Sequence, residues 1–254
     1  MTDIRTIAPP STSNQKASRE WSRRLALGAV AGPVLFNVAW LVLGAVSPGY
    51  TVSGTWISPY SAISQPISGL GLGETARYMN TAFVISGLLL LAGVIGVART
   101  LPSGGRAVAH IVSAILLGLA PVGLIIVGLF TLETPIRHLS GAMLVLATPV
   151  VSFLVTGWYL RDVPGWRRFG NQLLLASPIT LLLFIAYNLS FSQAAVAAGH
   201  GVAGLTQRVL FVEILGWFVA MGWLAYRQTS ASIETRVNTA LHHEIGDDQI
   251  LQSD

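Results

Sequence analysis

The sequence predicts an all-α fold, a polytopic membrane helical bundle with six transmembrane helices. Hydrophobic residues make up 52% of its 254 residues and charged residues only 10%, whereas soluble domains carry about 25% charged residues. The apolar residues fall in long blocks instead of alternating. Such blocks are typical of helices that cross a bilayer and not of a membrane β-barrel.

Six blocks reach the length that crossing a membrane requires. A hydrocarbon core of roughly 30 Å takes about 20 apolar residues in a helix. The expected spans are residues 25–46, 77–98, 107–130, 137–160, 169–192 and 208–226. They form one membrane domain, residues 24–227, between a disordered N-terminal tail of residues 1–23 and a C-terminal tail of residues 228–254.

The basic residues indicate how the helices are oriented. Of the 15 Lys and Arg residues, all but Arg77, Arg137 and Arg208 fall in the tails or in loops on the same side as the tails. Because Lys and Arg concentrate in cytoplasmic loops, both termini are expected to be cytoplasmic. The basic charge therefore reports topology, and nucleic acid is not expected as a partner. The absence of cysteine excludes disulfides, thiol catalysis and cysteine-ligated metals.

Prolines and glycines indicate where the helices bend and touch. The prolines inside predicted helices are Pro33, Pro121, Pro149 and Pro178. Each frees a backbone carbonyl and favours a kink, which either shapes a pocket or is simply tolerated in membrane helices. Gly28 and Gly32 form a small-xxx-small pair that is suited to close helix packing.

Three arginines stand where the second, fourth and sixth helices begin. With the N-terminus inside, Arg77, Arg137 and Arg208 all lie on the outer face, where positive charge is disfavoured. Helix N-termini and guanidinium groups both attract anions, so the three predict an outer pocket for an anionic lipid or amphiphile. The residues expected to complete this pocket are Asn80, His138, Gln207 and Glu213.

The same arginines have a structural interpretation as anchors that extend to lipid headgroups. Glu74, Glu133 and Glu213 are then the acids that neutralise them in pairs. Glu213 is the one formal charge inside a predicted span, near its outer end. It lies about 140° round the helix from Arg208, so we expect its partner on another helix. The candidate partners are Arg77, Arg137 and His138. A packing ion pair and a ligand contact both remain open for Glu213.

No catalytic or metal motif is present. The outer side holds Ser64, Ser68, His138 and His200, residue types that hydrolases use, but neither H-E-x-x-H nor G-x-S-x-G occurs. We therefore assign no catalytic residue, no metal and no cofactor, and favour a binding protein over an enzyme. A transporter component, a membrane-embedded lipid hydrolase and an accessory subunit of a membrane complex remain alternatives.

The stretch SQPISGLGLGETARYMN, residues 64–80, carries a family resemblance. Its motif residues are Pro66, Ser68, Leu70 and Gly71, with Asn80 at the head of the next helix. Two further signatures are GLF at residues 128–130, followed by Glu133 and His138, and GLTQR at residues 204–208. On these motifs the chain resembles, over residues 25–226, the six-helix prokaryotic membrane proteins grouped as domain of unknown function 998 (DUF998).

The resemblance implies a multi-pass protein of the bacterial cytoplasmic membrane whose motifs gather on the outer face, and it implies no activity. One position departs from the family pattern. Members often carry Asp or Glu between the motif Ser and Leu, where this chain has Gly69. From the arginines and the motifs together, we expect the chain to bind membrane lipid, an anionic one, in an outer-facing pocket.

Overall fold

The fold was obtained as a computed structural model, which describes residues 12–102 and 106–251, and the side chains of residues 17–228 within them. Its helices and strands are α1 Thr12–Ala26, α2 Gly28–Val46, β1 Tyr50–Val52, β2 Thr55–Ile57, η1 Ile67–Gly71, η2 Gly73–Thr75, α3 Ala76–Thr100, α4 Ala107–Leu129, α5 Pro135–Leu146, α6 Thr148–Leu160, α7 Arg167–Ser190, α8 Gln193–Ala197 and α9 Ala203–Leu251. The tail expected to be disordered is helical from Thr12, as α1, and its residues 1–11 lie outside the described part of the chain.

The prediction of six apolar spans is confirmed. The helical segments long and apolar enough to cross a membrane are Ala17–Val46, Gly73–Thr100, Ala107–Leu129, Pro135–Leu160, Arg167–Ser190 and Ala203–Gln228. The sixth begins at Ala203, five residues before the predicted start at Arg208. Glu213 therefore lies ten residues into its span, about 15 Å at 1.5 Å per residue, which is nearer the middle of the membrane than the sequence suggested.

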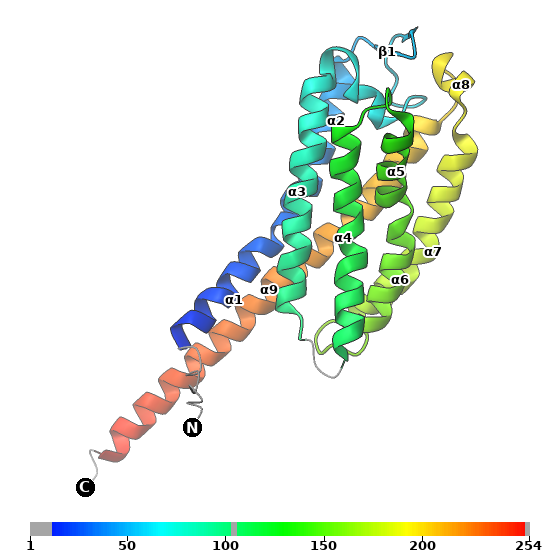
Figure 1. The fold of residues 1–254 in the computed structure, drawn as a ribbon. Helices are drawn as coiled ribbons and strands as arrows, with labels where there is room; N and C mark the ends of the chain where they lie inside the picture. The colour runs from blue at the N-terminus through cyan, green and yellow to red at the C-terminus, as the bar shows by residue number, and fades with distance from the viewer. Residues whose placement is uncertain (1–11, 103–105, 252–254) are drawn as a thin grey trace, which may run out of the picture.

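The spans form a closed ring in chain order. Helix α2 packs on α3, and α3 packs on α4. Helix α4 packs on both α5 and α6, and α6 packs on α7. Helix α9 closes the ring between α7 and α2 (Figure 1). The start of α1 and the end of α9 extend from the same end of the bundle (Figure 1). We call this the tail end, and the opposite end, which carries residues 47–75 and 191–202, the hairpin end.

Glycines set the closest contact in this ring, as the small-xxx-small pair predicted. A Cβ built on Gly28 would lie 2.3 Å from the Leu89 carbonyl oxygen, and one on Gly32 would lie 2.5 Å from that of Ser86. From the other side, a Cβ on Gly93 would meet the Ala29 nitrogen at 2.0 Å. Helices α2 and α3 are thus in backbone contact, which only small residues permit.

The fourth span is broken, and the break coincides with a proline. Helix α5 ends at Leu146, Ala147 intervenes, and α6 begins at Thr148 with Pro149 in its first turn. Proline lacks the N–H that would continue the ladder, so α5 and α6 become separate rods. By contrast α2, α4 and α7 continue through their prolines.

The hairpin end is folded rather than an open loop. Strands β1 and β2 pair antiparallel, with Tyr50 opposite Ile57, across a turn whose Ser53 and Gly54 both have positive φ. Two short 3-10 helices, η1 and η2, follow, and Ile67 and Leu70 of η1 are fully buried. This small sheet was not predicted from the sequence, and it lies over the mouth of the bundle (Figure 1).

Candidate functional site

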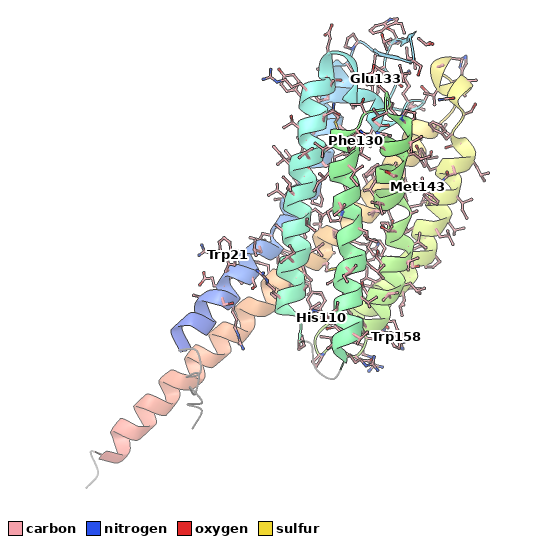
Figure 2. The ribbon with its side chains drawn as sticks, viewed as in Figure 1. Trp21, His110, Phe130, Glu133, Met143 and Trp158 are labelled. Atoms are coloured by element: carbon pink, nitrogen blue, oxygen red, sulfur yellow. The ribbon has the colours of Figure 1, made fainter. Side chains whose placement is uncertain are left out.

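A cavity of about 750 Å³ lies at the hairpin end, beneath the β-hairpin and α8. Its walls come from the hairpin, from Pro66 and Ser68 of the family motif, from α5, from α7 and from Gln207 of α9. The volume falls within the roughly 300–1,000 Å³ typical of small-molecule sites. Glu133 lies at the hairpin end of the bundle and Met143 deeper along α5 (Figure 2), and both line the cavity.

The break in the fourth span accounts for the cavity. Below the break, α6 packs along α7, whereas above it α5 packs on α4 and α9. The α5 residues Leu139, Met143 and Leu146 line the space that opens between α5 and α7, and Leu146 is the last residue before the break. Of the two interpretations of the helix prolines, Pro149 therefore fits the one in which a kink shapes a pocket.

The cavity has an apolar opening on the side of the bundle that faces lipid. Leu139 of α5 is 56% exposed and Phe191, at the end of α7, is 43% exposed, although both line the cavity. Leu139 lies in the fourth membrane-spanning segment, and Phe191 directly follows the fifth. The cavity therefore reaches the lipid-facing surface near these two residues.

His138 supplies an unpaired acceptor on the cavity wall. Its side chain is buried, and Nδ1 lies 2.8 Å from the Phe130 carbonyl oxygen. Because a carbonyl only accepts, Nδ1 carries the proton and Nε2 holds a free lone pair. No other described residue bonds to Nε2, so a ligand hydroxyl or amide is its natural donor.

Gln207 and Tyr187 form a second polar element of the wall. Gln207 accepts the backbone N–H of Ile67 through Oε1 at 2.7 Å and donates through Nε2 to the Tyr187 hydroxyl at 3.3 Å. The hydroxyl proton of Tyr187 is then available to the cavity, which Tyr187 lines. Ser68 also lines the cavity, and its hydroxyl has no partner among the described side chains and backbone. Sequence reasoning missed Tyr187, because a tyrosine within an apolar span carries no motif.

Arg208 lies outside the cavity and holds the hairpin-end loop through both terminal nitrogens of its guanidinium, while its buried Nε has no partner among the described residues. Its Nη1 donates to the carbonyl oxygens of Ala62 at 2.8 Å, Gln65 at 3.0 Å and Gly204 at 2.9 Å, and Nη2 donates to the Tyr60 hydroxyl. The guanidinium also lies over the Trp40 ring, 5.2 Å from its centroid. The side chain is 6% exposed, so this arginine is a structural tie and offers no face to an anion.

The GLTQR signature now has a physical meaning, because four of its residues contact one loop segment. Leu205 does so through its backbone N–H, which donates to the Ile63 carbonyl oxygen at 2.9 Å. A Cβ on Gly204 would lie 2.3 Å from the Gln65 carbonyl oxygen, so only glycine allows this approach. The Gln207 side chain accepts the backbone N–H of Ile67, and Arg208 donates to the carbonyl oxygens of Ala62 and Gln65. The signature fixes the loop that carries the Pro-Ile-Ser motif.

The motif residues beyond Ser68 also have structural roles. Asn80 of α3 donates through Nδ2 to the Gly71 carbonyl oxygen at 3.0 Å, and a Cβ on Gly71 would meet Asn80 Oδ1 at 2.5 Å. The Leu70 carbonyl accepts from Thr75 Oγ1 at 2.8 Å. Gly69, where the family often has an acid, is covered by the Tyr50 ring, whose Cε1 would lie 2.6 Å from an added Cβ.

The other two arginines are exposed and lie apart from the cavity lining. Arg77 lies over the Tyr78 ring at 5.7 Å and Arg137 over the Phe130 ring at 5.0 Å. Of the residues predicted for the site, the cavity therefore brings together Pro66, Ser68, His138 and Gln207. It does not bring together the three arginines, Asn80 or Glu213.

Glu213 is bound by hydroxyl and indole groups and not by a cation. Thr180 Oγ1 of α7 lies 3.0 Å from both carboxyl oxygens, and Trp217 Nε1 donates to Oε1 at 2.8 Å. The partner on another helix is thus Thr180, and within the described residues none of the expected cations pairs with Glu213. These contacts tie α7 to α9 near the middle of the span.

Comparison with known families gives one match. The family described as "Protein of unknown function (DUF998)" matches residues 30–224, a range that covers four of the membrane spans entirely, most of the first and sixth, and every residue that lines the cavity. Comparison with curated proteins and with solved structures finds no match.

Proposed function

The chain belongs to the DUF998 family, whose description states no function, so we propose one from the cavity. The protein takes an amphiphile from the bilayer leaflet at the hairpin end and holds it between α5 and α7. The apolar part lies along Leu139, Met143 and Leu146, and the polar group meets His138, Tyr187 and Ser68. We expect this leaflet to be the outer one of a bacterial cytoplasmic membrane, because the distribution of Lys and Arg predicts cytoplasmic termini.

The observation that carries the proposal is the pairing of an apolar lateral opening with a buried polar wall. The opening at Leu139 and Phe191 suits an acyl or isoprenoid chain. The wall offers one acceptor, His138 Nε2, and two hydroxyls, those of Tyr187 and Ser68, which lack a full set of partners. Pockets of this composition are typical of specific binding, because a few placed polar groups orient a largely apolar ligand.

The charges at the cavity bear on the headgroup. Its lining contains Glu133 but no lysine or arginine, and Arg208 is occupied by backbone carbonyls. These features favour an uncharged polar group that donates a hydrogen bond to His138. Arg137, adjacent to His138 in the chain, is the cation through which an anionic headgroup would bind. The experiment below therefore distinguishes an anionic lipid from an uncharged one.

One observation favours lipid hydrolysis as a second candidate. Ser68 Oγ and His138 Nε2 line the same cavity, and both are free of partners within the described chain. A serine nucleophile needs a base, and His138 in its Nδ1–H tautomer is the histidine that lines the same cavity. Conversion of the bound amphiphile, lost in Ser68→Ala, would establish this reaction.

The test is native mass spectrometry of the detergent-purified protein, with extraction and identification of whatever co-purifies. Ala142→Phe fills the cavity from α5, and Ala220→Phe makes the same change on the exposed face of α9. We expect one bound amphiphile in the wild type and in Ala220→Phe, and none in Ala142→Phe. Each variant is first compared with wild type by circular dichroism and gel filtration.

Two smaller changes test the polar wall. Tyr187→Phe removes one hydroxyl and His138→Gln removes the free ring nitrogen, so each should weaken retention about tenfold, the equivalent of one hydrogen bond. Arg137→Gln and Arg77→Gln test the anionic arm. Retention of the amphiphile by Ala142→Phe, or a bare wild-type protein, would overturn the proposal and direct attention to a protein partner.

A further inference from the structure

A second opening lies at the other end of the bundle, between α3 and α4. It is a groove of about 370 Å³ whose walls include Val94 and Ala98 of α3 and Ile111 and Ala114 of α4. His110, which Figure 2 places at the tail end of α4, and Arg99 lie at its polar end. The groove shares no residue with the hairpin-end cavity.

The way α3 and α4 pack explains why the groove exists. In the half nearer the hairpin end, a Cβ on Gly87 would lie 2.9 Å from the Pro121 carbonyl oxygen, and one on Gly128 would lie 2.8 Å from that of Asn80. Toward the tail end this close fit ends. A Cβ on Gly118 would meet only the Leu91 side chain, at 3.8 Å. The two helices converge at one end and leave a furrow at the other.

The furrow faces lipid. Ile95, Ile111 and Ile115 are 42%, 56% and 60% exposed, and all three line it within membrane-spanning helices. From His110 to Gly118 the furrow runs along eight residues, about 12 Å at 1.5 Å per residue. This length is close to one leaflet of a hydrocarbon core of roughly 30 Å.

The polar end of the furrow holds a cation without a partner. Arg99 lies in the last turn of α3, is exposed, and has no hydrogen bond or ion pair to any described side chain or backbone group. Arg106, by contrast, pairs with Asp162 and lies over the Trp158 ring. The ring of His110 is fixed, since Nε2 bonds to the Ala98 carbonyl oxygen at 2.9 Å and the ring stacks on Tyr159.

We infer that this furrow is a binding site for one anionic phospholipid of the tail-end leaflet. An acyl chain lies along Gly118, Ala114 and Ile95, and the phosphate meets the Arg99 guanidinium. Basic groups at the ends of membrane helices recognise anionic headgroups, and an acyl chain is what fills an apolar furrow inside a bilayer. The site is independent of the proposed function, because it lies at the opposite end of the bundle.

The test uses the absence of native cysteine, which allows a single introduced cysteine to carry a fluorophore. Ile115→Cys places the label in the furrow. Leu175→Cys is the matched control, since it is lipid-exposed and lies eight residues into α7, as Ile115 does in α4. Both proteins are reconstituted in phosphatidylcholine bilayers, and quenching is measured with brominated phosphatidylglycerol or brominated phosphatidylcholine.

We expect phosphatidylglycerol to quench Ile115→Cys with about fivefold preference over phosphatidylcholine, the effect of one arginine near the membrane surface, and to show no preference at Leu175→Cys. Adding Arg99→Gln should abolish the preference, whereas Arg168→Gln at the same end should keep it. Adding Gly118→Leu should weaken quenching by both lipids about tenfold, the equivalent of about two buried methylenes, and Gly216→Leu, whose Cβ meets nothing within 4 Å, should not.

Equal quenching by the two lipids at Ile115→Cys would overturn the inference, as would a preference that survives Arg99→Gln. Quenching unchanged by Gly118→Leu would show that lipid contacts the helices without entering the furrow, which also overturns it.

Discussion

Gln207 accepts the backbone N–H of Ile67 through Oε1 at 2.7 Å, although 140 residues separate the two in the chain. Ile67 is fully buried, so no water replaces this acceptor if it is lost. The contact joins the start of the sixth span to the family motif, and it fixes the wall of the cavity as well as the fold of the loop.

Gln207→Leu should therefore destabilise the protein by about 1–3 kcal/mol, because it leaves a buried N–H without an acceptor. Thermal unfolding in detergent measures the effect, and hydrogen exchange should locate it in residues 59–75. Gln193→Leu is the control, since Gln193 is exposed on α8. Equal melting of the two variants would show that the Ile67 N–H does not depend on Gln207.

Substitution with lysine should destabilise the protein at Arg208 but not at Arg77 or Arg137. Arg208→Lys loses a planar group that donates to three carbonyls and a hydroxyl, and should destabilise by about 1.5–3 kcal/mol or more. Arg77→Lys and Arg137→Lys, at exposed positions, should stay within about 0.5 kcal/mol of wild type. If instead all three melt like wild type and lose a bound anionic lipid together, the three-arginine site predicted from the sequence is the correct one.

The hairpin end should lose stability in alkali. Burial raises the pKa of Tyr50, and nearby Tyr60 raises it further; burial also raises the pKa of Tyr60, against the opposing effect of the Arg208 guanidinium. A phenol whose folded pKa exceeds its unfolded value of about 10 stabilises fully below that pH, and this contribution is lost as the pH rises through the folded pKa. Stability should thus be level up to about pH 10 and fall above it.

Tyr50→Phe tests this, because the Tyr50 ring is buried and its hydroxyl has no partner within the described residues. The variant should melt like wild type at neutral pH and lose less stability between about pH 10 and 12. Tyr78→Phe, at an exposed position of α3, should keep the wild-type slope. A Tyr50→Phe curve parallel to wild type would show that other groups cause the alkaline loss.

Glu213 should be replaceable by glutamine and not by leucine. Gln keeps an acceptor oxygen for Trp217 Nε1, whereas Leu leaves this indole N–H without an acceptor, at a cost of about 1–3 kcal/mol. The Thr180 hydroxyl can donate to the Ala176 carbonyl in either variant. Melting of the two variants measures the difference, with Glu133→Leu, at an exposed position between α4 and α5, as the control. A glutamine variant that folds normally but loses a measured ion flux would favour the transporter alternative.

Two glycine substitutions should act with opposite sign. Gly93→Ala places a methyl 2.0 Å from the Ala29 nitrogen, which forces α2 and α3 apart and should cost about 1–3 kcal/mol or more. Gly216→Ala meets nothing within 4 Å and should be neutral or stabilising by up to about 1 kcal/mol, since alanine favours helix. Comparable melting of the two would contradict backbone contact between α2 and α3.

The six spans were predictable because length and hydropathy alone decide which segments cross a bilayer. The role of Arg208 was not, since its partners are backbone carbonyls of residues 62, 65 and 204, and every loop offers carbonyls. From the sequence, a positive charge at the start of a helix predicted a bound anion, whereas in the structure Arg208 hydrogen-bonds within the chain.

Part of the candidate site was predictable and part was not. His138, Gln207 and Ser68 were found from their place on one face and from the family motifs. The cavity itself depends on where α5 leaves α6 and on a hairpin that folds over the opening, and both are set by tertiary packing. Tyr187 therefore entered only with the structure.

The single interruption at Ala147 divides the fourth span between two tasks. Below it, α6 interlocks with α7 and sustains the ring; above it, α5 faces the cavity. The opposite face of α5 still packs closely on α4, where a Cβ on Gly123 would lie 2.6 Å from the Gly141 carbonyl oxygen. Substitutions on the cavity face of α5 can therefore change which molecule fits without disturbing α6. Diversification among relatives should then concentrate at the cavity-lining positions between Pro135 and Leu146, so that ligand selectivity evolves on one face of a short helix whose other face supports the bundle.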